Sequence, residues 1–183
     1  MFTLNFPDKI ETERLVLQRL RYEDAEEIFY TYSSKPEVTR FLSWPTHKSV
    51  DDTRAFLEYS IASWKTGKDY SYSIRLKAYG NLIGSFGFIN DSGKLQFGYA
   101  ISPTHWGRGY ATEACKMMMD IAKSFPGVFR ISTFVDADNI ASINVLKKSG
   151  LQYEATLKNW FRFVNQNNEP KDCILMYLPF ERK

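Results

Sequence analysis

Apolar and polar positions alternate along this chain in two rhythms, one typical of strands and the other of helices. Between residues 70 and 76 every second side chain is apolar, which predicts a strand with one buried face. Turn residues at Gly80-Asn81 and Asp91–Gly93 separate two further predicted strands, 82–89 and 95–101. Together these three segments predict an antiparallel meander.

Other segments carry apolar residues three or four positions apart, which is the spacing of one helix face. The predicted helices run from Asp24 to just before Pro36, from Ser49 to Gly67, over 112–124 and over 140–149. At the start of the second helix, Ser49 and Asp52 form a variant of the capping box. Further strands are predicted over 14–20, 130–135, 152–164 and 173–178.

The predicted order of elements is βααβββαβαββ. Because runs of antiparallel strands stand beside βαβ units, we expect a mixed α/β (α+β) fold in which helices cover both faces of a central sheet. No internal repeat, low-complexity segment or linker rich in proline and glycine divides the chain. One domain over residues 1–183 is therefore expected.

Composition narrows the function classes. Hydrophobic residues make up 44% of the 183 residues and aromatic residues 16%, which suits a packed core rather than a disordered chain. The net charge of +3 arises from interspersed charges of both signs, which argues against a nucleic-acid partner. Cys115, Cys173, His47 and His105 lack the spacing of metal ligands, so no metal is expected.

The distribution of apolar residues also indicates the compartment in which the protein acts. The chain has no apolar run near the roughly 18–20 residues that a membrane span needs. Residues 1–10 lack the basic and apolar regions of a signal peptide. We therefore expect a cytoplasmic protein without a membrane partner.

The most informative segment is Ile101-Ser-Pro-Thr-His-Trp-Gly-Arg-Gly-Tyr-Ala-Thr-Glu-Ala114, where a strand ends and a helix begins. Backbone N–H groups in such a loop converge with the positive end of the helix dipole and form an anion site. Gly107 and Gly109 allow the backbone to approach a pyrophosphate closely. The segment is neither a Walker loop nor a three-glycine dinucleotide loop. The two glycines alone are equally compatible with an ordinary turn.

Residues 106–114 resemble the acetyl-CoA pyrophosphate loop of the GNAT superfamily, whose general pattern is Gln/Arg-x-x-Gly-x-Gly/Ala. Trp106 stands at the first position, Gly109 at the fourth and Ala111 at the sixth. The tryptophan departs from the general pattern but is similar to the RimJ/RimL-like branch, where Trp-Gly-Lys/Arg-Gly-Tyr is usual.

Three further blocks resemble the same branch, namely Thr12–Leu20, Phe97–Ile101 and Asp138–Leu151, so the resemblance covers nearly the whole chain. It implies the GNAT fold, in which a mostly antiparallel mixed sheet contains one splayed parallel pair and carries helices on both faces. It also implies an acetyl-CoA-dependent N-acetyltransferase of the branch that acetylates ribosomal-protein N-termini.

The resemblance assigns residues to acetyl-CoA as well. The strand backbone would bind the pantetheine, the loop backbone would bind the pyrophosphate, and Asn139 would contact the pantetheine arm. The implied cofactor-binding residues are Tyr99, Ala100, Ile101, Trp106, Gly107, Arg108, Gly109, Tyr110, Ala111, Thr112, Asn139 and Ser142. Asn139 is alternatively a simple helix N-cap, and Thr112 an ordinary residue of the first helical turn.

Ser142 is the implied catalytic residue. Many GNAT enzymes place a tyrosine seven residues after the asparagine, where it protonates the departing thiolate, but Leu146 occupies that position here. Ser142 lies one helical turn earlier on the same face, and RimL-like enzymes resemble this arrangement. Because a serine hydroxyl is a poor acid, we expect a hydrogen bond to the thiolate rather than proton transfer. A serine on a polar helix face is the alternative.

The general base is missing from its usual place. GNAT enzymes often carry a glutamate on the strand before the loop, but Gln96 stands there, and an amide cannot act as a base. Either another group reaches the amine through water, or the acceptor arrives neutral. A peptide α-amine has a pKa of about 8 and is partly neutral at pH 7 without a base. This favours an N-terminal α-amine, such as that of a ribosomal protein, over lysine or polyamine acceptors.

Trp44, on the connection between the first two helices, is a candidate wall of the acceptor channel, although a purely structural role is equally compatible. Cys115 falls on the apolar face of a helix, so we expect direct attack by the amine in a ternary complex, without an acyl-enzyme.

Two other functions stay open: a CoA-binding module without activity, and a small-molecule N-acetyltransferase that acts on polyamines or antibiotics. The pattern is compatible with a monomer or a homodimer.

Overall fold

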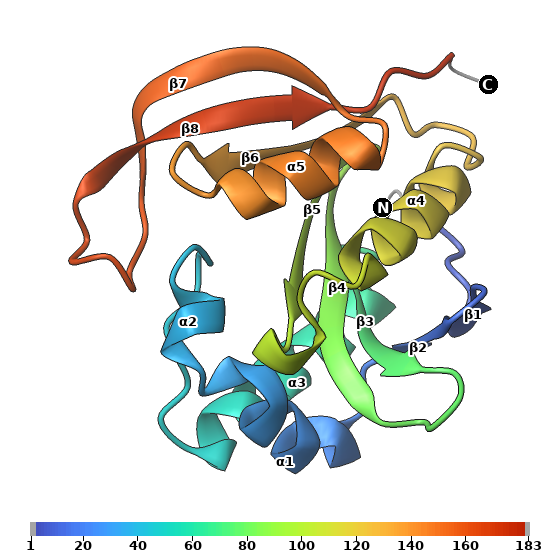
Figure 1. The fold of residues 1–183 in the computed structure, drawn as a ribbon. Coiled ribbons are helices and arrows are strands. Elements are labelled where there is room, and N and C mark those ends of the chain that lie inside the picture. The colour runs from blue at the N-terminus through green and yellow to red at the C-terminus, as the bar shows by residue number, and fades with distance from the viewer. Residues whose placement is uncertain (1–2, 182–183) are drawn as a thin grey trace.

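The computed structural model describes residues 3–181, which form an eight-stranded mixed sheet with helices on both of its faces (Figure 1). The strands are β1 (Lys9–Glu11), β2 (Leu15–Arg19), β3 (Asp69–Leu76), β4 (Leu82–Asp91), β5 (Lys94–Ile101), β6 (Arg130–Asp136), β7 (Gln152–Arg162) and β8 (Pro170–Tyr177). They lie in the order β1-β2-β3-β4-β5-β6-β8-β7. All neighbours are antiparallel except β5 and β6, which are parallel. The predicted fold class is confirmed.

The helices are α1 (Ala25–Ile28), α2 (Pro36–Thr39), α3 (Val50–Lys65), α4 (Tyr110–Ala122) and α5 (Ile140–Lys148). The capping box predicted for α3 is present. The Ser49 hydroxyl accepts a hydrogen bond of 3.3 Å from the Asp52 N–H, and the Asp52 carboxylate accepts one of 3.0 Å from the Ser49 N–H. No helix among residues 3–181 is long and apolar enough to cross a membrane.

Two short elements depart from the predicted order. Strand β1 contains only three residues, of which Ile10 alone is buried, so its alternation is too brief to stand out in the sequence. Helix α2 begins at Pro36, where only the end of the preceding helix was predicted. Proline suits a first helical position because the N–H that it lacks would have no partner within the helix. Helix α1 itself ends after one turn and continues as a π-helical turn over Phe29–Ser33.

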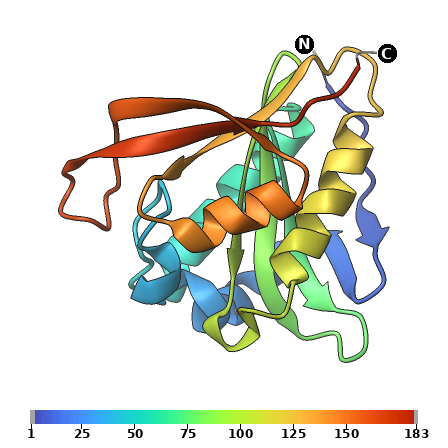
Figure 2. The ribbon, with the colours of Figure 1, turned by 45° about the horizontal axis from the view of Figure 1, so that its top comes forward.

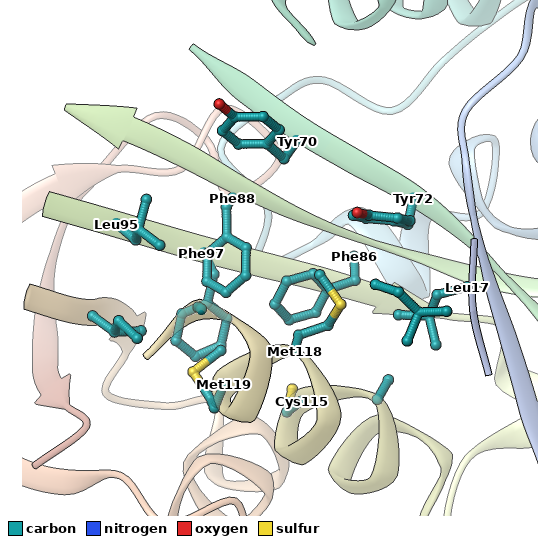
Figure 3. Packing of buried hydrophobic residues seen from close by; sticks show 14 of the residues in the cluster. Leu17, Tyr70, Tyr72, Phe86, Phe88, Leu95, Phe97, Cys115, Met118 and Met119 are labelled. Atoms are coloured by element: carbon teal, nitrogen blue, oxygen red, sulfur yellow. The ribbon is translucent and has the colours of Figure 1, made fainter. Parts of the chain in front are cut away.

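The two faces of the sheet are packed differently. On one face, Met118 and Met119 of α4 lie against a cluster of phenylalanines that β4 and β5 contribute, Phe86, Phe88 and Phe97 (Figure 3). Neighbouring rings in that cluster have centroids 5.0 to 5.9 Å apart, which is the range of favourable aromatic contacts. The sheet and α4 therefore share the main core, in which both methionines are packed.

On the opposite face, small residues form a cross-strand row. Ser71 pairs with Gly87, and Gly87 pairs with Gly98 on the next strand. The helices α1 and α3 pack on this side, where Ile28 and Leu57 belong to a second core. A Cβ added to Gly98 would meet nothing within 4 Å, so the sheet leaves open space on this face where β5 separates from β6.

The parallel pair opens along its length. Strands β5 and β6 are paired only from Lys94 to Gln96 on β5, although β5 continues to Ile101 and β6 to Asp136. At the fork, the buried Thr133 hydroxyl donates a 2.7 Å hydrogen bond to the Phe97 carbonyl. In Figure 1, β6, β8 and β7 run across the top of the view, while β4 and β5 run downward from them. This divergence is the predicted splayed pair.

Candidate active site

The splay opens into a cleft of about 660 Å³, a volume typical of ligand sites. Residues from five parts of the fold line it, namely β5 (96–101), the loop and first turn of α4 (105–107 and 109–112), β6 (133–135), α5 (139, 141–142, 144–146 and 148) and α2 with the turn after it (37–38 and 40–43), together with Phe163. Helices α4 and α5 lie on the same side of the sheet and flank the fork (Figure 2). The cleft therefore reaches from the α4–α5 side, through the opened sheet, to the side of α2.

The loop before α4 is built to hold an anion. Gly107 and Gly109 have φ angles of +73° and +79°, which side chains other than glycine rarely adopt. Within residues 3–181, the N–H groups of 107–109 form no hydrogen bond, and the first-turn N–H groups of α4 have no partner within the helix. The Trp106 indole N–H donates to the Ile101 carbonyl at 2.6 Å, which folds the loop back onto the end of β5. Free donors at a helix N-terminus fit the pyrophosphate of acetyl-CoA.

A clamp formed by two residues just before β2, Thr12 and Arg14, holds this helix end. The Glu113 carboxylate, in the first turn of α4, accepts hydrogen bonds from the Thr12 hydroxyl at 2.6 Å and from the Arg14 Nε at 2.6 Å. Arg14 also donates to the Arg108 carbonyl at 3.0 Å and stacks over the Tyr110 ring at 4.6 Å. Burial alone would raise the pKa of Glu113, but the hydrogen bonds from Thr12 and Arg14 outweigh it and lower the pKa.

Inside the cleft, β5 and α5 meet through two hydroxyl groups. The Tyr99 hydroxyl lies 2.8 Å from the Ser142 hydroxyl, and both residues line the cleft. Burial raises the pKa of Tyr99 above its ordinary value, so the phenol keeps its proton at neutral pH. Leu146, one turn further along α5, is buried and offers only its hydrocarbon surface.

Asn139 has the capping role that its sequence position suggested. Its side-chain oxygen caps α5 by accepting a 3.1 Å hydrogen bond from the Ser142 N–H. Its amide Nδ2 group forms no hydrogen bond within residues 3–181, and the residue lines the cleft. The cap thus fixes the side chain while one donor stays available to a ligand.

The side of the cleft toward α2 is lined mainly by aromatic side chains. Gln96 and Gly98 point to this side of β5, and a Cβ added to Gly98 would meet nothing within 4 Å. Aromatic side chains from three different elements complete the lining, Phe41, Phe134 and Phe163. Among the described residues that line the cleft, Glu37 is the one carboxylate, whereas Arg40 and Lys148 are cations.

Asn165, in the turn between β7 and β8, ties this wall together. Its Nδ2 donates to the Thr39 and Trp44 carbonyls at 2.7 and 2.9 Å, and its oxygen accepts from the Thr46 N–H at 3.0 Å. Figure 1 shows the β7–β8 hairpin reaching down to the α2 region. One amide therefore connects two segments of the wall that lie far apart in the sequence.

Most of the predicted site residues come together in this cleft. Those that line it are Tyr99, Ala100, Ile101, Trp106, Gly107, Gly109, Tyr110, Ala111, Thr112, Asn139 and Ser142. Two others do not: Arg108 contributes its carbonyl to Arg14, and Trp44 packs in the second core, with its ring 5.1 Å from His47 and 6.5 Å from Phe56. The residues after α2 that do line the cleft are Phe41, Leu42 and Ser43.

The sequence did not single out Arg14, Glu113, Thr133 and Asn165. Arg14 and Glu113 both stand in blocks that carry the family resemblance, but they are 99 residues apart, so nothing local indicates that they meet. Thr133 looks like an ordinary strand residue, and Asn165 like a turn residue. A paired pattern of substitutions among relatives would be the signal for such contacts.

The strand order and the cleft define a class of protein, the acetyltransferases of GNAT type, in which acetyl-CoA lies between two splayed strands. The chain belongs to this family, because residues 14–152 match the model described as "Acetyltransferase (GNAT) domain". It is 31% identical, over 166 residues, to the uncharacterised N-acetyltransferase YoaA of Bacillus subtilis strain 168. That match covers 89% of this chain and 92% of the relative.

Solved structures share the fold at low identity. The microcin C7 self-immunity acetyltransferase MccE, in complex with acetyl-CoA and AMP, superposes with a TM-score of 0.86 at 19% identity, over 96% of this chain and 98% of that one. RimL, a ribosomal L7/L12 α-N-protein acetyltransferase, superposes with a TM-score of 0.84 at 18% identity, over 94% of each chain.

The family match and these relatives together show that the chain is an acetyl-CoA-dependent N-acetyltransferase, and acetyl-CoA is its acetyl donor. Among residues 3–181, no group of three or more His, Cys, Asp or Glu side chains is arranged to hold a metal ion.

Proposed function

We propose that the chain acetylates a primary amine, namely the N-terminal α-amine of a protein or peptide, as a member of the RimJ/RimL-like branch. The observation that carries this proposal is the charge of the side chains that line the cleft as a whole. A single carboxylate, Glu37, lines the described cleft, together with the cations Arg40 and Lys148. The fold likeness to RimL is compatible with this acceptor class.

The charge argument separates acceptor classes. A polyamine or an aminoglycoside brings several positive charges, and each needs a carboxylate or water to replace its lost hydration. A cleft lined by one carboxylate and two cations does not provide those partners. A peptide α-amine brings at most one charge and, with a pKa of about 8, loses it readily. The aromatic lining then suits the first side chains of a peptide better than a polycation.

The roles that we propose follow the geometry of the cleft. The N–H groups of residues 107–112 hold the pyrophosphate, the backbone of residues 99–101 faces the pantetheine, and Asn139 contacts its arm through Nδ2. The Ser142 hydroxyl serves the thiolate sulfur through a hydrogen bond. Acetyl-CoA supplies the activated acetyl group as a thioester.

Direct attack in a ternary complex agrees with the state of Cys115. This thiol is fully buried in the main core, and burial raises its pKa to about 12. A buried, protonated thiol is not a nucleophile, so it offers no site for an acyl-enzyme. Cys173 is also buried, with a pKa raised to about 11, and it does not line the cleft.

The acceptor wall is proposed to act in two layers. Phe41, Leu42 and Ser43 would contact the acceptor, and Trp44 would support them from the second core through its packing on Phe56. We further propose that the enzyme works in the cytoplasm, as a monomer or a homodimer, on a protein substrate such as a ribosomal protein. Neither a nucleic acid nor a membrane is part of the proposed function.

Acetylation of defined acceptors tests the proposal. We expect turnover on peptides with a free α-amine, and none above background on the same peptides with a blocked α-amine and an internal lysine, on spermidine or on an aminoglycoside. Ser142→Ala should lower kcat on the accepted peptide about tenfold to a hundredfold, because one hydrogen bond to a charged group is lost. Acetylation confined to spermidine or the aminoglycoside would reject the α-amine assignment in favour of a small-molecule enzyme.

A further inference from the structure

The phenol of Tyr99 has no role in the mechanism so far, in which only the backbone of this residue faces the cofactor. Its hydroxyl nevertheless ends 2.8 Å from Ser142, the side chain proposed to serve the sulfur. Tyr99 comes from β5, at the open part of the splay, and Ser142 comes from the first turn of α5. Two elements that flank the cofactor cleft thus meet through one pair of hydroxyl groups.

We propose that Tyr99 is a positioning residue, whose phenol fixes the Ser142 hydroxyl so that one O–H of the pair is directed at the thiolate sulfur. This inference rests on the proposed function of the cleft and on the proposed role of Ser142. The inference adds a second side chain at the sulfur, that of Tyr99, which the sequence analysis expected to act only through its backbone.

The count of hydrogens supports this role. Two hydroxyl groups carry two hydrogens, and the contact between them uses one, whichever group donates. Neither side chain forms another hydrogen bond within residues 3–181. One O–H is therefore left without a protein acceptor, and both residues line the cleft. A ligand atom in the cleft is the natural acceptor for it.

The pair is also held in place from both sides. The Tyr99 ring packs against the main core, and the residue is paired with Phe86 of β4. Ser142 is held at the start of α5 by the hydrogen bond from its N–H to the Asn139 side chain. Two hydroxyl groups on separately anchored elements need no reorganisation when charge develops on a nearby atom, which is the condition for electrostatic stabilisation.

The transfer of the acetyl group balances without any change in the protonation of the Tyr99 and Ser142 hydroxyl groups. When the amine attacks, the C–S bond breaks and its electron pair goes to the sulfur, which accepts a hydrogen bond from the free O–H. The proton that finally neutralises the sulfur is the one that the acceptor nitrogen loses. Burial raises the pKa of Tyr99, so the phenol keeps its proton throughout and contributes by orientation.

Binding of free CoA provides a test that needs no turnover. The pair should lower the pKa of the bound thiol, so affinity for CoA relative to desulfo-CoA should rise with pH from that lowered pKa up to the pKa of the free thiol. We expect the ratio to grow about tenfold between about pH 6 and about pH 9 in the wild type. It should stay flat in Tyr99→Phe, in Ser142→Ala and in the double variant.

Titration calorimetry of these variants includes its own controls. Tyr79→Phe removes a hydroxyl from a side chain that is 83% exposed, outside the cleft, and should behave as the wild type. At low pH, where the thiol is protonated, Tyr99→Phe should bind CoA as the wild type does, which shows that the site remains folded. A pH-dependent ratio in Tyr99→Phe equal to that of the wild type would overturn the role of Tyr99, and so would a flat ratio in the wild type.

Kinetics on an accepted peptide provide the second measurement. Tyr99→Phe should lower kcat about tenfold and leave KM for acetyl-CoA unchanged, with no additional loss in the Ser142→Ala background. Additive losses in the double variant would overturn the positioning role. A wild type that acetylates only small amines, while the binding ratio still depends on pH and on Tyr99, would reject the α-amine acceptor but support the role of Tyr99.

Discussion

At the scale of single residues, Gln96 bears on the protonation state in which the acceptor amine must enter the cleft. It stands on β5 and lines the cleft where a carboxylate would act as the base, and its amide accepts no proton at any ordinary pH. We expect the acceptor amine to arrive neutral, rather than to lose its proton to another group through water. The rate should then depend on pH as the ionisation of the acceptor does.

Gln96→Glu tests this dependence. With the wild type, kcat/KM on a peptide α-amine should rise about tenfold per pH unit below about pH 8, because only the neutral amine attacks. In the variant, a carboxylate ionised above about pH 5 can take the proton, so the rate at about pH 6.5 should increase about threefold to tenfold. Gln152→Glu, on exposed β7, provides the matched control and should leave the pH profile unchanged. A wild-type rate that is level from about pH 6 to about pH 8 would mean that another group serves as the base.

Single residues also differ in whether their neighbours in the site can be predicted from the sequence. Asn139, Ser142 and Leu146 share one helix, so their relative placement follows from helical spacing alone. Tyr99 was expected to act only through its backbone. Its hydroxyl meets Ser142 across 43 residues of sequence, and no local pattern encodes such a contact.

At the scale of elements, the N-terminus of α4, which we propose binds the pyrophosphate, is held by residues that lie just before β2. Arg14, next to the first residue of β2, donates to Glu113 and to the Arg108 carbonyl, so it fixes both the helix end and the loop before it. The loop has two glycines with positive φ and is intrinsically adaptable. The clamp is what keeps its N–H groups converged.

Arg14→Ala should therefore weaken acetyl-CoA binding about threefold to tenfold, with little change in kcat, since the clamp acts on the cofactor loop and is partly exposed. Titration calorimetry measures this effect, and Lys9→Ala, which removes an exposed cation paired with Glu11, is the control for charge alone. The pKa of Glu113 is lowered, so the clamp is complete above the ordinary carboxylate pKa and is lost as pH falls through the lowered value. An unchanged affinity in Arg14→Ala would show that the loop is pre-formed without the clamp.

Elements differ in how far the sequence predicts them. Helix α3 was predictable because its capping box and its sixteen residues of helical pattern are local signals. Helix α2 has four residues and β1 has three, which is too short for either periodicity to appear. Such short elements depend on tertiary contacts, and α2 supplies part of the proposed acceptor wall.

At the scale of the whole molecule, the half of the cleft that we propose binds acetyl-CoA could be predicted from the sequence, and the half that we propose binds the acceptor could not. The proposed cofactor half consists of the continuous segment from β5 through the loop to α4, together with α5, and the motifs in both parts indicate their geometry. The acceptor half is assembled from α2, the turn after it, β6 and the β7–β8 turn, which Asn165 joins. Trp44 illustrates the difference, because the neighbouring residues 41–43 line the cleft while the indole packs behind them. The extent of the domain over residues 1–183 stays a prediction, and its ends, residues 1–2 and 182–183, lie outside the described residues.

The central claim is that one opened sheet brings acetyl-CoA and an α-amine together for direct transfer. Initial rates measured while both substrates are varied test this claim most directly. For a ternary complex, double-reciprocal plots of rate against peptide concentration, at several acetyl-CoA concentrations, should intersect. Parallel lines, together with acetylated protein in the absence of peptide, would mean that an acyl-enzyme forms, and would contradict direct transfer.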